Sequence, residues 1–375
     1  MKYKVMLCEG NRLMLGRLAN VISATPDFKL VAKYQDYQEA LGQGKVFNPN
    51  LILLDVESIS ASNTIQDFCD AYPNASIICL SEHWRADSAS HLIQAGAKGY
   101  LLKPFTSDEL IDAVETFAKG GMETVSHTMC FFSPKGKSGK TTLIANLALA
   151  LARMTGEKVG IIDADLQFGD MAVFFNLEPQ STIYEATRDV SFLSPLELRS
   201  YFTKVNDNVS VLCGTKTPSY IDKVSIPNLE TLIKMSKSLF KYLLIDVPAG
   251  FNPTSIAAAE MSGMTYVVSM LNGAYEVKHA QRALEIFEAW EDYKQRVKVV
   301  FTRVVPCNQE SQRKMSEAIG YPVEAVVPNA YMVVSKAADN GQMALDLEPD
   351  SPLAMSINYL AGRIIRQNDT GRGAG

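Results

Sequence analysis

Short apolar runs that alternate with amphipathic stretches of helical spacing dominate the first third of the chain. Five such runs occur before residue 105, and each is bounded by polar or turn-forming residues. They are Lys4–Cys8, Leu30–Tyr34, Leu51–Leu54, Ala75–Leu80 and Lys98–Leu102. Apolar strands joined by helices are typical of a parallel sheet that is covered on both faces. The pattern therefore predicts an α/β domain of five βα units.

Further along the chain, an apolar strand runs into a loop rich in glycine and lysine and then into a helical pattern. The loop extends from Ser133 to Thr142. Backbone N–H groups in such a loop, at the start of a helix, converge on phosphate oxygens. We therefore predict an ATP site in which Lys140 contacts the outer phosphates and Thr141 ligates Mg²⁺. An additional lysine, Lys135, is placed where it can reach toward a second subunit, which indicates a homodimer.

Two positions depart from the usual phosphate-binding motif. Pro134 stands where the first glycine is expected and removes one N–H donor. Lys137 stands where related loops have another glycine, so a positive φ at this position would strain it. We expect a reduced nucleotide affinity, and an ordinary Gly/Ser/Lys-rich turn is the alternative. The residues predicted to hold the nucleotide phosphates are Gly136, Lys137, Ser138, Gly139, Lys140, Thr141 and Thr142.

Carboxylates follow two other apolar strands. The run Lys158–Ile162 precedes Asp163 and Asp165, and the run Tyr242–Ile245 precedes Asp246. Ligands bind at the carboxyl ends of strands in open α/β sheets, so these aspartates and the loop should share one crevice. The preference of aspartate for turns explains one such residue more easily than three.

From Thr128 to Arg366 the chain resembles the ParA/MinD family of ATPases, whose loop carries the extra lysine as Lys-Gly-x-x-Gly-Lys-Thr. The run Asp163-Ala-Asp-Leu-Gln-Phe-Gly-Asp170 is similar to that of the TadZ/CpaE branch. This resemblance implies a P-loop NTPase with a doubly wound, mostly parallel sheet. It also implies an ATP-dependent dimer that hydrolyses ATP weakly.

The resemblance also assigns roles to single residues. Lys135 would reach the partner's nucleotide, and Lys140 would hold the β and γ phosphates. Asp165 would orient the attacking water, so these three form the expected catalytic set. Gly250 would place a backbone amide near the γ-phosphate.

Metal and base recognition follow from the same resemblance. Thr141 would ligate Mg²⁺, and Asp163 and Asp246 would support its water shell. The family usually reads adenine with an Asn-Arg pair after a late strand. Here Thr302 and Arg303 occupy these two positions, so base selectivity is less certain than phosphate binding.

The first 119 residues resemble the flavodoxin-like receiver domains of response regulators. Asp55, Ser81 and Lys103 end the third, fourth and fifth strands, where receivers carry their phospho-acceptor, hydroxyl and lysine. The first strand ends in Glu9-Gly10 instead of an acidic pair, which weakens the metal site. We therefore favour a receiver shell kept for protein contacts over slow phosphorylation of Asp55.

The length of 375 residues suits two domains that each bury a core. We predict a receiver-like domain over residues 1–119, a linker over 120–127, an ATPase domain over 128–366 and a disordered tail over 367–375. The net charge of −5 gives no strong nucleic-acid signal. The basic groups Lys294–Lys298 and Arg313-Lys314 fit a solvated helix surface better than a phosphate-binding face.

The sequence predicts a cytoplasmic protein. Its six cysteines have no metal or redox spacing and are expected to be reduced. No apolar run is long enough to cross a bilayer. The last helical pattern, Leu353–Arg366, has few cations and is expected to pack on its own sheet, so that any membrane association is indirect.

Three interpretations remain open. The leading one is a TadZ/CpaE-like ATP-dependent switch that localises and helps assemble the Tad/Flp pilus machinery, often at a cell pole. The pilus partners rest on resemblance alone. The alternatives are a DNA-partitioning ATPase with a sensor domain and a nucleotide-binding scaffold with little hydrolysis.

Overall fold

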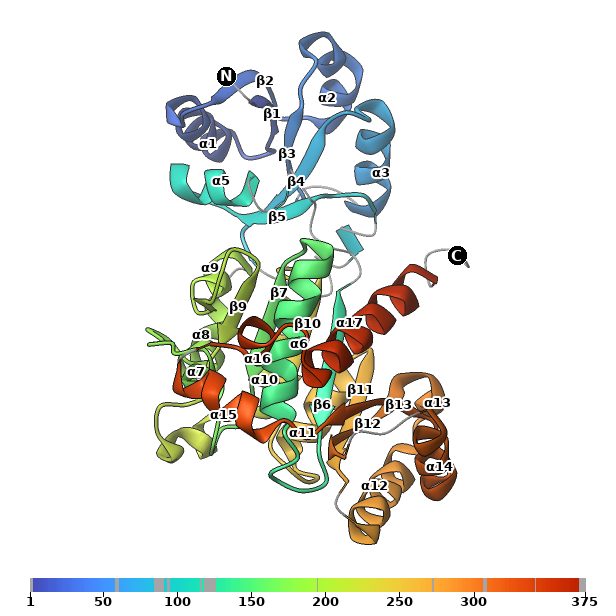
Figure 1. Cartoon of the computed structure of the whole chain (residues 1–375). Coiled ribbons are helices and arrows are strands. Elements are labelled where there is room, and N and C mark those ends of the chain that lie inside the picture. Colours follow the sequence, from blue (N-terminus) through green and yellow to red (C-terminus); the bar gives the residue numbers. More distant parts are fainter. Residues whose placement is uncertain are drawn as a thin grey trace. The chain divides into compact units, whose positions relative to one another are not determined.

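The structure, a computed structural model, describes residues 3–370 apart from 58–60, 84–90, 93–94, 115–116, 118–125, 194, 272, 306–308 and 341. Residues 120–125 of the predicted linker, residues 371–375 of the predicted tail, and Cys307 lie outside this description. The chain divides into two compact units between Thr124 and Val125, and the segment Phe192–Leu198 groups with the first. Figure 1 identifies the elements of both units.

The first unit is a five-stranded parallel sheet in the order β2-β1-β3-β4-β5. The predicted five βα pattern is confirmed, and the central strand β3 is buried throughout. The strands are β1 (Tyr3–Cys8), β2 (Phe28–Tyr34), β3 (Leu51–Asp55), β4 (Ser76–Ser81) and β5 (Gly99–Leu102). The helices are α1 (Arg12–Ala24), α2 (Tyr37–Gln43), η1 (Gly44–Phe47), α3 (Ala61–Ala71) and α5 (Ser107–Ala113).

Local signals in the sequence set the helix starts of this unit. The Asn11 side chain accepts hydrogen bonds from the backbone of Leu13 and Met14 and so caps α1. Asp36 caps α2 in the same way, and Thr106 forms a capping box with Glu109 at α5. These caps place the helices directly after the strand ends, where the candidate phospho-site residues lie.

The second unit contains an eight-stranded sheet in the order β13-β12-β11-β6-β10-β7-β9-β8. All neighbouring strands are parallel except β8 and β9, so the predicted doubly wound, mostly parallel sheet is confirmed. The strands are β6 (His127–Phe132), β7 (Val159–Asp163), β8 (Thr203–Lys204), β9 (Val209–Leu212), β10 (Tyr242–Asp246), β11 (Met264–Met270), β12 (Val297–Val304) and β13 (Val323–Pro328).

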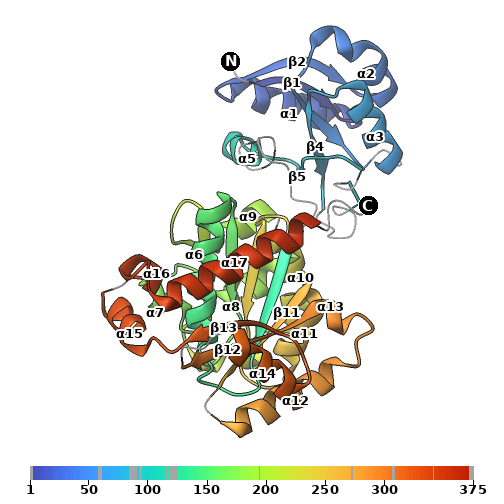
Figure 2. The same ribbon diagram turned by 45° about the vertical axis from the view of Figure 1, so that its right-hand side comes forward.

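Helices lie on both faces of this sheet, as Figures 1 and 2 show. The long ones are α6 (Lys140–Thr155), α10 (Ile226–Ser236), α11 (Pro253–Met261), α12 (Ala274–Phe287), α14 (Gln309–Ile319), α15 (Tyr331–Asp339) and α17 (Pro352–Thr370). The short ones are α7 (Met171–Phe174), α8 (Ile183–Asp189), η3 (Val190–Phe192), α9 (Pro195–Arg199), η4 (Pro218–Lys223), α13 (Tyr293–Arg296) and α16 (Ala344–Leu347).

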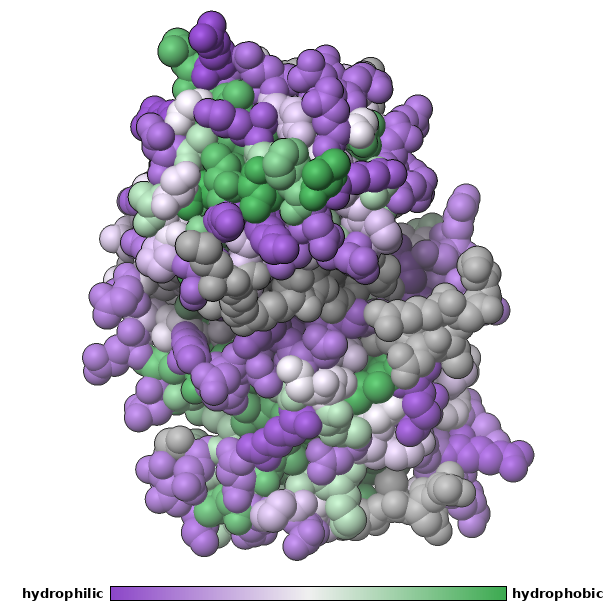
Figure 3. Space-filling model, turned by 90° about the horizontal axis from the view of Figure 1, so that it is seen from above, coloured by the Kyte–Doolittle hydropathy of each residue, from purple (hydrophilic) through white to green (hydrophobic). Residues whose placement is uncertain are grey.

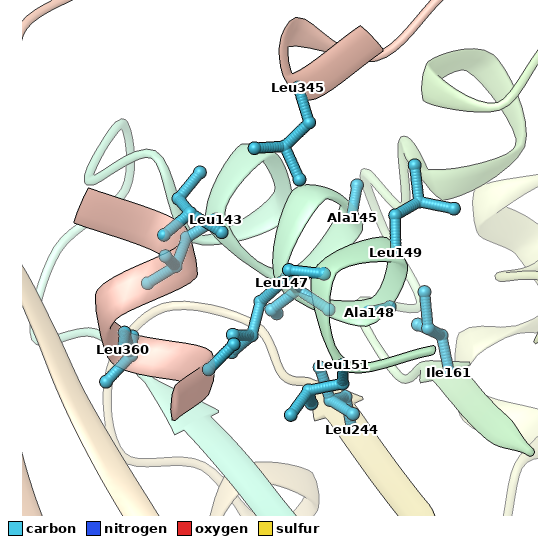
Figure 4. Packing of buried hydrophobic residues seen from close by; sticks show 14 of the residues in the cluster. Leu143, Ala145, Leu147, Ala148, Leu149, Leu151, Ile161, Leu244, Leu345 and Leu360 are labelled. Carbon is cyan, nitrogen blue, oxygen red and sulfur yellow. The ribbon is translucent and has the colours of Figure 1, made fainter. Parts of the chain in front are cut away.

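Helix α6 is the centre of the second core. Figure 4 shows its side chains between Leu345 of α16, Leu360 of α17, and the sheet residues Ile161 and Leu244. Packing on several sides requires an apolar surface all around the helix, which the Leu/Ala-rich run after Thr142 provides. Its burial fixes the helix N-terminus, and therefore the loop before it, against the sheet.

Helix α17 packs against α6 and β13. Its residues Ile357, Leu360 and Ile364 are buried, so the expected packing of this helix on its own sheet is confirmed. The helix runs on to Thr370. The last helix thus continues four residues beyond the predicted end of the ATPase domain at residue 366.

The face in Figure 3 is largely hydrophilic, with some hydrophobic patches. Within the described residues, no helix has the length and apolarity needed to cross a membrane. The five cysteines in this part of the chain are free thiols.

Gly99 is a position where β5 lies too close to the side chain of Phe117 to carry a side chain of its own. A Cβ atom on Gly99 would lie 2.5 Å from the ring of Phe117, which is fully buried. We predict that Gly99→Ala lowers the free energy of unfolding of the first unit by about 1–3 kcal/mol. Hydrogen exchange of peptides from β1 and β3, measured across a urea series, reports this unit separately.

The matched control is Gly42→Ala. Gly42 lies in α2 and has no atom within 4 Å of the added Cβ, so this change should stabilise the same unit by about 0.5–1 kcal/mol. Equal stability of the Gly99→Ala variant and the unchanged chain would contradict the packing described here.

Candidate functional site

The loop between β6 and α6 has two residues with left-handed backbone. Lys137 has φ 66° and Gly139 has φ 78°. The predicted condition for strain at Lys137 is therefore met, since a side chain in this region costs about 1 kcal/mol or more. Lys135, Gly136 and Lys137 are exposed at the outer rim of the loop, while Ser138 and Lys140 are buried.

One carboxylate holds the inner end of this loop. Lys140 Nζ donates to Asp246 Oδ1 at 2.6 Å and also to the carbonyl of Val247. Thr141 Oγ1 donates to Asp246 Oδ2 at 2.8 Å. Asp246 ends β10 and is only 2% exposed, so its charge is offset by Lys140 within the protein. The structure thus brings together Lys140, Thr141 and Asp246 as the sequence predicts.

Asp163 lies on the neighbouring strand, in register with Asp246. Its carboxylate is fully buried and accepts from the backbone N–H of Asp165 at 3.2 Å and of Met171 at 3.1 Å. Burial first, and the nearby charge of Asp246 second, raise the pKa of Asp163 well above its ordinary value. This side chain therefore organises the loop after β7 as well as facing the site.

Two glycines that the sequence analysis missed enclose this carboxylate. A Cβ on Gly169 would lie 2.6 Å from Asp163 Oδ2, and one on Gly214 would lie 3.3 Å from the same atom. Gly169 belongs to the quoted run after β7, whereas Gly214 follows β9, far away in the sequence. The sequence therefore offered a signal for Gly169 alone, through its place in the run Asp163–Asp170.

Asp165 is half-buried and forms a local turn. Its Oδ1 accepts from the backbone of Gln167 at 3.3 Å and of Phe168 at 3.1 Å. Asp170 follows in the same loop and is the residue before α7. Burial first, then the charges of Asp165 and Asp246, raise the pKa of Asp170. Four carboxylates thus share this edge of the sheet.

The donor set suits a hard cation that keeps several waters. Among the described residues, no three Asp, Glu, His or Cys side chains form a metal-binding group by themselves. The Thr141 hydroxyl and the Asp246 carboxylate are oxygen donors 2.8 Å apart, and Mg²⁺ uses few protein oxygens together with phosphate and water. These two residues therefore fit the predicted Mg²⁺ position.

The loop after β10 is tied to the same site. Gly250 has φ 82°, and its N–H donates to the carbonyl of Ser133 at 2.8 Å. The Ser133 hydroxyl in turn donates to the carbonyl of Lys135 at 2.5 Å. Gly250 therefore connects the end of β10 to the loop that carries Lys135.

A pocket with a volume of about 70 Å³ opens beside the start of α6. Its wall includes Gly139 and Thr142 from the phosphate loop and Thr302 and Arg303 from β12. The sequence analysis missed the rest of the wall, which comes from α6, from β13 and α15 with the connection between them, and from α17. These further residues are Leu143, Val327, Pro328, Asn329, Ala330, Tyr331, Val334, Leu353 and Ile357.

Thr302 and Arg303 differ in what they contact. Thr302 is 3% exposed, and its hydroxyl donates to the carbonyl of Ser138 in the phosphate loop. Arg303 is exposed, has φ 54°, and its Nε lies 3.9 Å from the position of a Cβ on Gly139. The Thr302 hydroxyl is thus engaged with the loop, and Arg303 lies at the border between loop and pocket.

The first unit has its own buried charge cluster. Lys103 Nζ lies 2.7 Å from both Glu9 Oε2 and Asp55 Oδ1. Burial lowers the pKa of Lys103, but the bonds to Asp55 and Glu9 outweigh it, so the net shift is upward. The structure therefore brings together three of the four predicted phospho-site residues.

Ser81, the fourth, faces a residue that the sequence analysis missed. Its hydroxyl donates to Glu57 Oε1, and the backbone N–H of Glu82 donates to the same oxygen at 3.0 Å. The bond from Ser81 is the main cause that lowers the pKa of Glu57. Glu57 stands two residues after Asp55, which was the available signal.

The model of the CobQ/CobB/MinD/ParA nucleotide-binding domain matches residues 129–343, more than half of the chain. The chain belongs to this family. The response regulator receiver domain matches residues 5–115. The MinD/ParA-family region therefore contains the phosphate loop and all four carboxylates, and the receiver region contains the Lys103 cluster.

Relatives of known sequence cover the two parts separately. A putative septum site-determining protein MinD of Chlorella vulgaris is 30% identical over 54% of this chain and 72% of its own length. An uncharacterized ATP-binding protein of Methanocaldococcus jannaschii is 29% identical over 62% of this chain and 85% of its own. The transcriptional regulatory protein DegU of Brevibacillus brevis is 29% identical over 32% of this chain and 52% of its own length.

Solved structures share the fold of the second unit. A ParA family ATPase from Chlorobium tepidum aligns with a TM-score of 0.59 at 19% identity over 63% of this chain and 99% of its own. MinD from Pyrococcus horikoshii, complexed with Mg-ADP, aligns with a TM-score of 0.54 at 21% identity over 64% of this chain and 96% of its own.

The buried Asp163 predicts a pH dependence of stability. Because the pKa of Asp163 in the folded state is raised above the ordinary value of 3.8, ionisation opposes folding. This cost is absent below pH 3.8 and grows as pH rises through the folded-state pKa. We predict that, without nucleotide and magnesium, the stability of Asp163→Asn relative to the unchanged chain increases from pH 4.5 to pH 7.5, which are about one and about four units above the ordinary pKa.

Urea unfolding of both proteins at the two pH values measures this difference. The comparison between variant and unchanged chain cancels the titration of carboxylates that do not interact with Asp163. A difference in unfolding free energy that does not change with pH would contradict the raised pKa.

Proposed function

We propose that this protein is an ATP-dependent dimerising switch of the TadZ/CpaE type, which localises and helps assemble the Tad/Flp pilus machinery, often at a cell pole. The observation that carries the switch is the exposure of Lys135 at the rim of a loop whose inner residues, Lys140 and Thr141, are both held by Asp246. The pilus role is supported by the likeness of residues 163–170 to that branch.

ATP binding would use contacts that already exist within the protein. Lys140 would exchange its bonds to Asp246 and Val247 for bonds to phosphate oxygens, which leaves Asp246 and Thr141 to hold Mg²⁺. The metal ion supplies charge neutralisation between the phosphates. Asp165 would orient the attacking water once its carboxylate leaves the local turn.

A scaffold with little hydrolysis is the second candidate, because specific observations favour it. The Asp165 carboxylate is engaged by two backbone N–H groups, Lys137 is strained, and Pro134 lacks a donor. We expect each of these features to slow turnover or weaken nucleotide binding, and none of them to prevent dimer formation. We therefore propose weak ATPase activity.

The DNA-partitioning alternative finds less support in the basic residues. Arg296 donates to carbonyls at the end of α11 and lies over the ring of Trp290. Arg313 and Lys314 form exposed ion pairs with Glu317 and Glu310 along their own helix. These groups serve packing and solvation, as the sequence analysis favours.

Partners are proposed at two levels. A solved complex of MinC with MinD from Aquifex aeolicus aligns with the second unit at a TM-score of 0.53, so a related fold carries a protein partner. For this chain we propose a homodimer first, and pilus assembly proteins as readers of its ATP state. The protein would act in the cytoplasm, with membrane contact through partners.

The trans role of Lys135 gives a test of the proposed switch. Lys135→Ala should weaken the ATP-dependent dimer about tenfold or more, because a charged contact to the partner's phosphates is lost. Binding of ATP to the monomer should change by less than about threefold. Analytical ultracentrifugation with Mg·ATP measures the first quantity, and equilibrium dialysis at low protein concentration measures the second.

Lys137→Ala is the matched control, since Lys137 is an exposed lysine two positions away with the same charge. Because Lys137 belongs to the predicted phosphate-binding set, the dimer constants are compared at saturating Mg·ATP, where Lys137→Ala should leave the dimer constant near that of the unchanged chain. Equal losses of dimerisation and monomer binding in Lys135→Ala would remove the trans role.

For the first unit we propose a receiver shell that serves protein contacts. Gly10 supplies no carboxylate, and Lys103 already neutralises both Glu9 and Asp55. We predict little labelling of Asp55 by acetyl phosphate with Mg²⁺, and an increase of several-fold in the Gly10→Asp variant, which restores the acidic pair. Intact-protein mass spectrometry measures the labelling, and Asp55→Asn gives the background. Rapid stoichiometric labelling of the unchanged chain would contradict the proposal that the first unit serves only protein contacts.

A further inference from the structure

The peptide bond between Ser138 and Gly139 lies at the centre of the phosphate loop. Ser138 is flanked by Lys137 and Gly139, which both have left-handed backbone. Its carbonyl accepts a hydrogen bond from the hydroxyl of Thr302, which comes from the end of β12. Thr302 is 3% exposed, so this contact is shielded from water.

This contact fixes the direction of a backbone donor. In a trans peptide the C=O and the following N–H point in opposite directions. Because the Ser138 carbonyl points to Thr302, the N–H of Gly139 points away from Thr302, to the opposite side of the loop. That N–H belongs to the predicted phosphate cradle. A flipped peptide would present a carbonyl oxygen in its place and repel phosphate.

Gly139 by itself does not select one orientation. Glycine adopts positive and negative φ with similar ease, so rotation of this peptide has little intrinsic cost. The hydroxyl of Thr302 therefore supplies the preference. The Thr302 hydroxyl also lies 3.4 Å from the carbonyl oxygen of Ser269. This distance is longer than the one to the carbonyl oxygen of Ser138, so Ser138 is the preferred acceptor.

We propose that Thr302 is a positioning residue for phosphate recognition, acting through the Ser138–Gly139 peptide. This inference rests on the proposed nucleotide binding and deepens it. It differs from the expectation that Thr302 contacts the base. Since the contact is to the backbone of the loop, its effect is the same for every nucleotide that carries the same phosphates.

The test uses the full chain and isothermal titration calorimetry with Mg·ATP and Mg·GTP. Thr302→Val keeps the side-chain volume and removes the hydroxyl, and it should weaken both nucleotides about three- to tenfold, with an unchanged ratio between them. Thr302→Ser keeps the hydroxyl and should bind within about twofold of the unchanged chain.

The outcomes separate the inference from the proposed function. If the unchanged chain binds neither nucleotide, the proposed function fails and takes this inference with it. If the unchanged chain binds and Thr302→Val binds equally well, only the inference is overturned. A changed ATP-to-GTP ratio in Thr302→Val, or a Thr302→Ser variant as weak as Thr302→Val, would also overturn it, because these results indicate base contact or packing.

Discussion

The second unit depends on one buried carboxylate, that of Asp246. It accepts hydrogen bonds from Lys140 and Thr141, the predicted phosphate and Mg²⁺ ligands of the phosphate loop. Its strand, β10, pairs with the two strands that end at Phe132 and Asp163. A buried charge is stable only when it is paired, and the protein pairs this carboxylate with Lys140. In the proposed function, phosphate would compete with Asp246 for Lys140, and this competition would couple nucleotide binding to the loop after β10.

The edge of the sheet turns this local contact into a connected site. Asp163 organises the loop after β7 through Asp165 and Met171, and Gly250 ties the loop after β10 to Ser133. On the other side, Thr302 links β12 to the phosphate loop. Two strand ends, those of β10 and β12, thus reach the same ten-residue loop through hydrogen bonds, and the burial of α6 keeps that loop in place.

Much of this could be predicted from the sequence, because the signals are local. A glycine- and lysine-rich loop between strand and helix, and aspartates at strand ends, specify where Lys140, Thr141 and Asp246 meet. Contacts between distant segments were not predictable in this way. The bond of Thr302 to Ser138 and the approach of Gly214 to Asp163 depend on strand register and side-chain rotamers. The hydrogen bond from Ser81 to Glu57 depends on the direction of the Glu57 side chain, which the alternation of apolar and polar residues along the chain does not predict.

The central claim is that a bound triphosphate joins two copies of the chain. The most direct test is the mass of the unmodified protein, measured by light scattering with Mg·ATP, with Mg·ADP and without nucleotide. The account predicts twice the chain mass of 41.2 kDa with Mg·ATP and a return to the single-chain mass with Mg·ADP or no nucleotide. The same mass under all three conditions would contradict it.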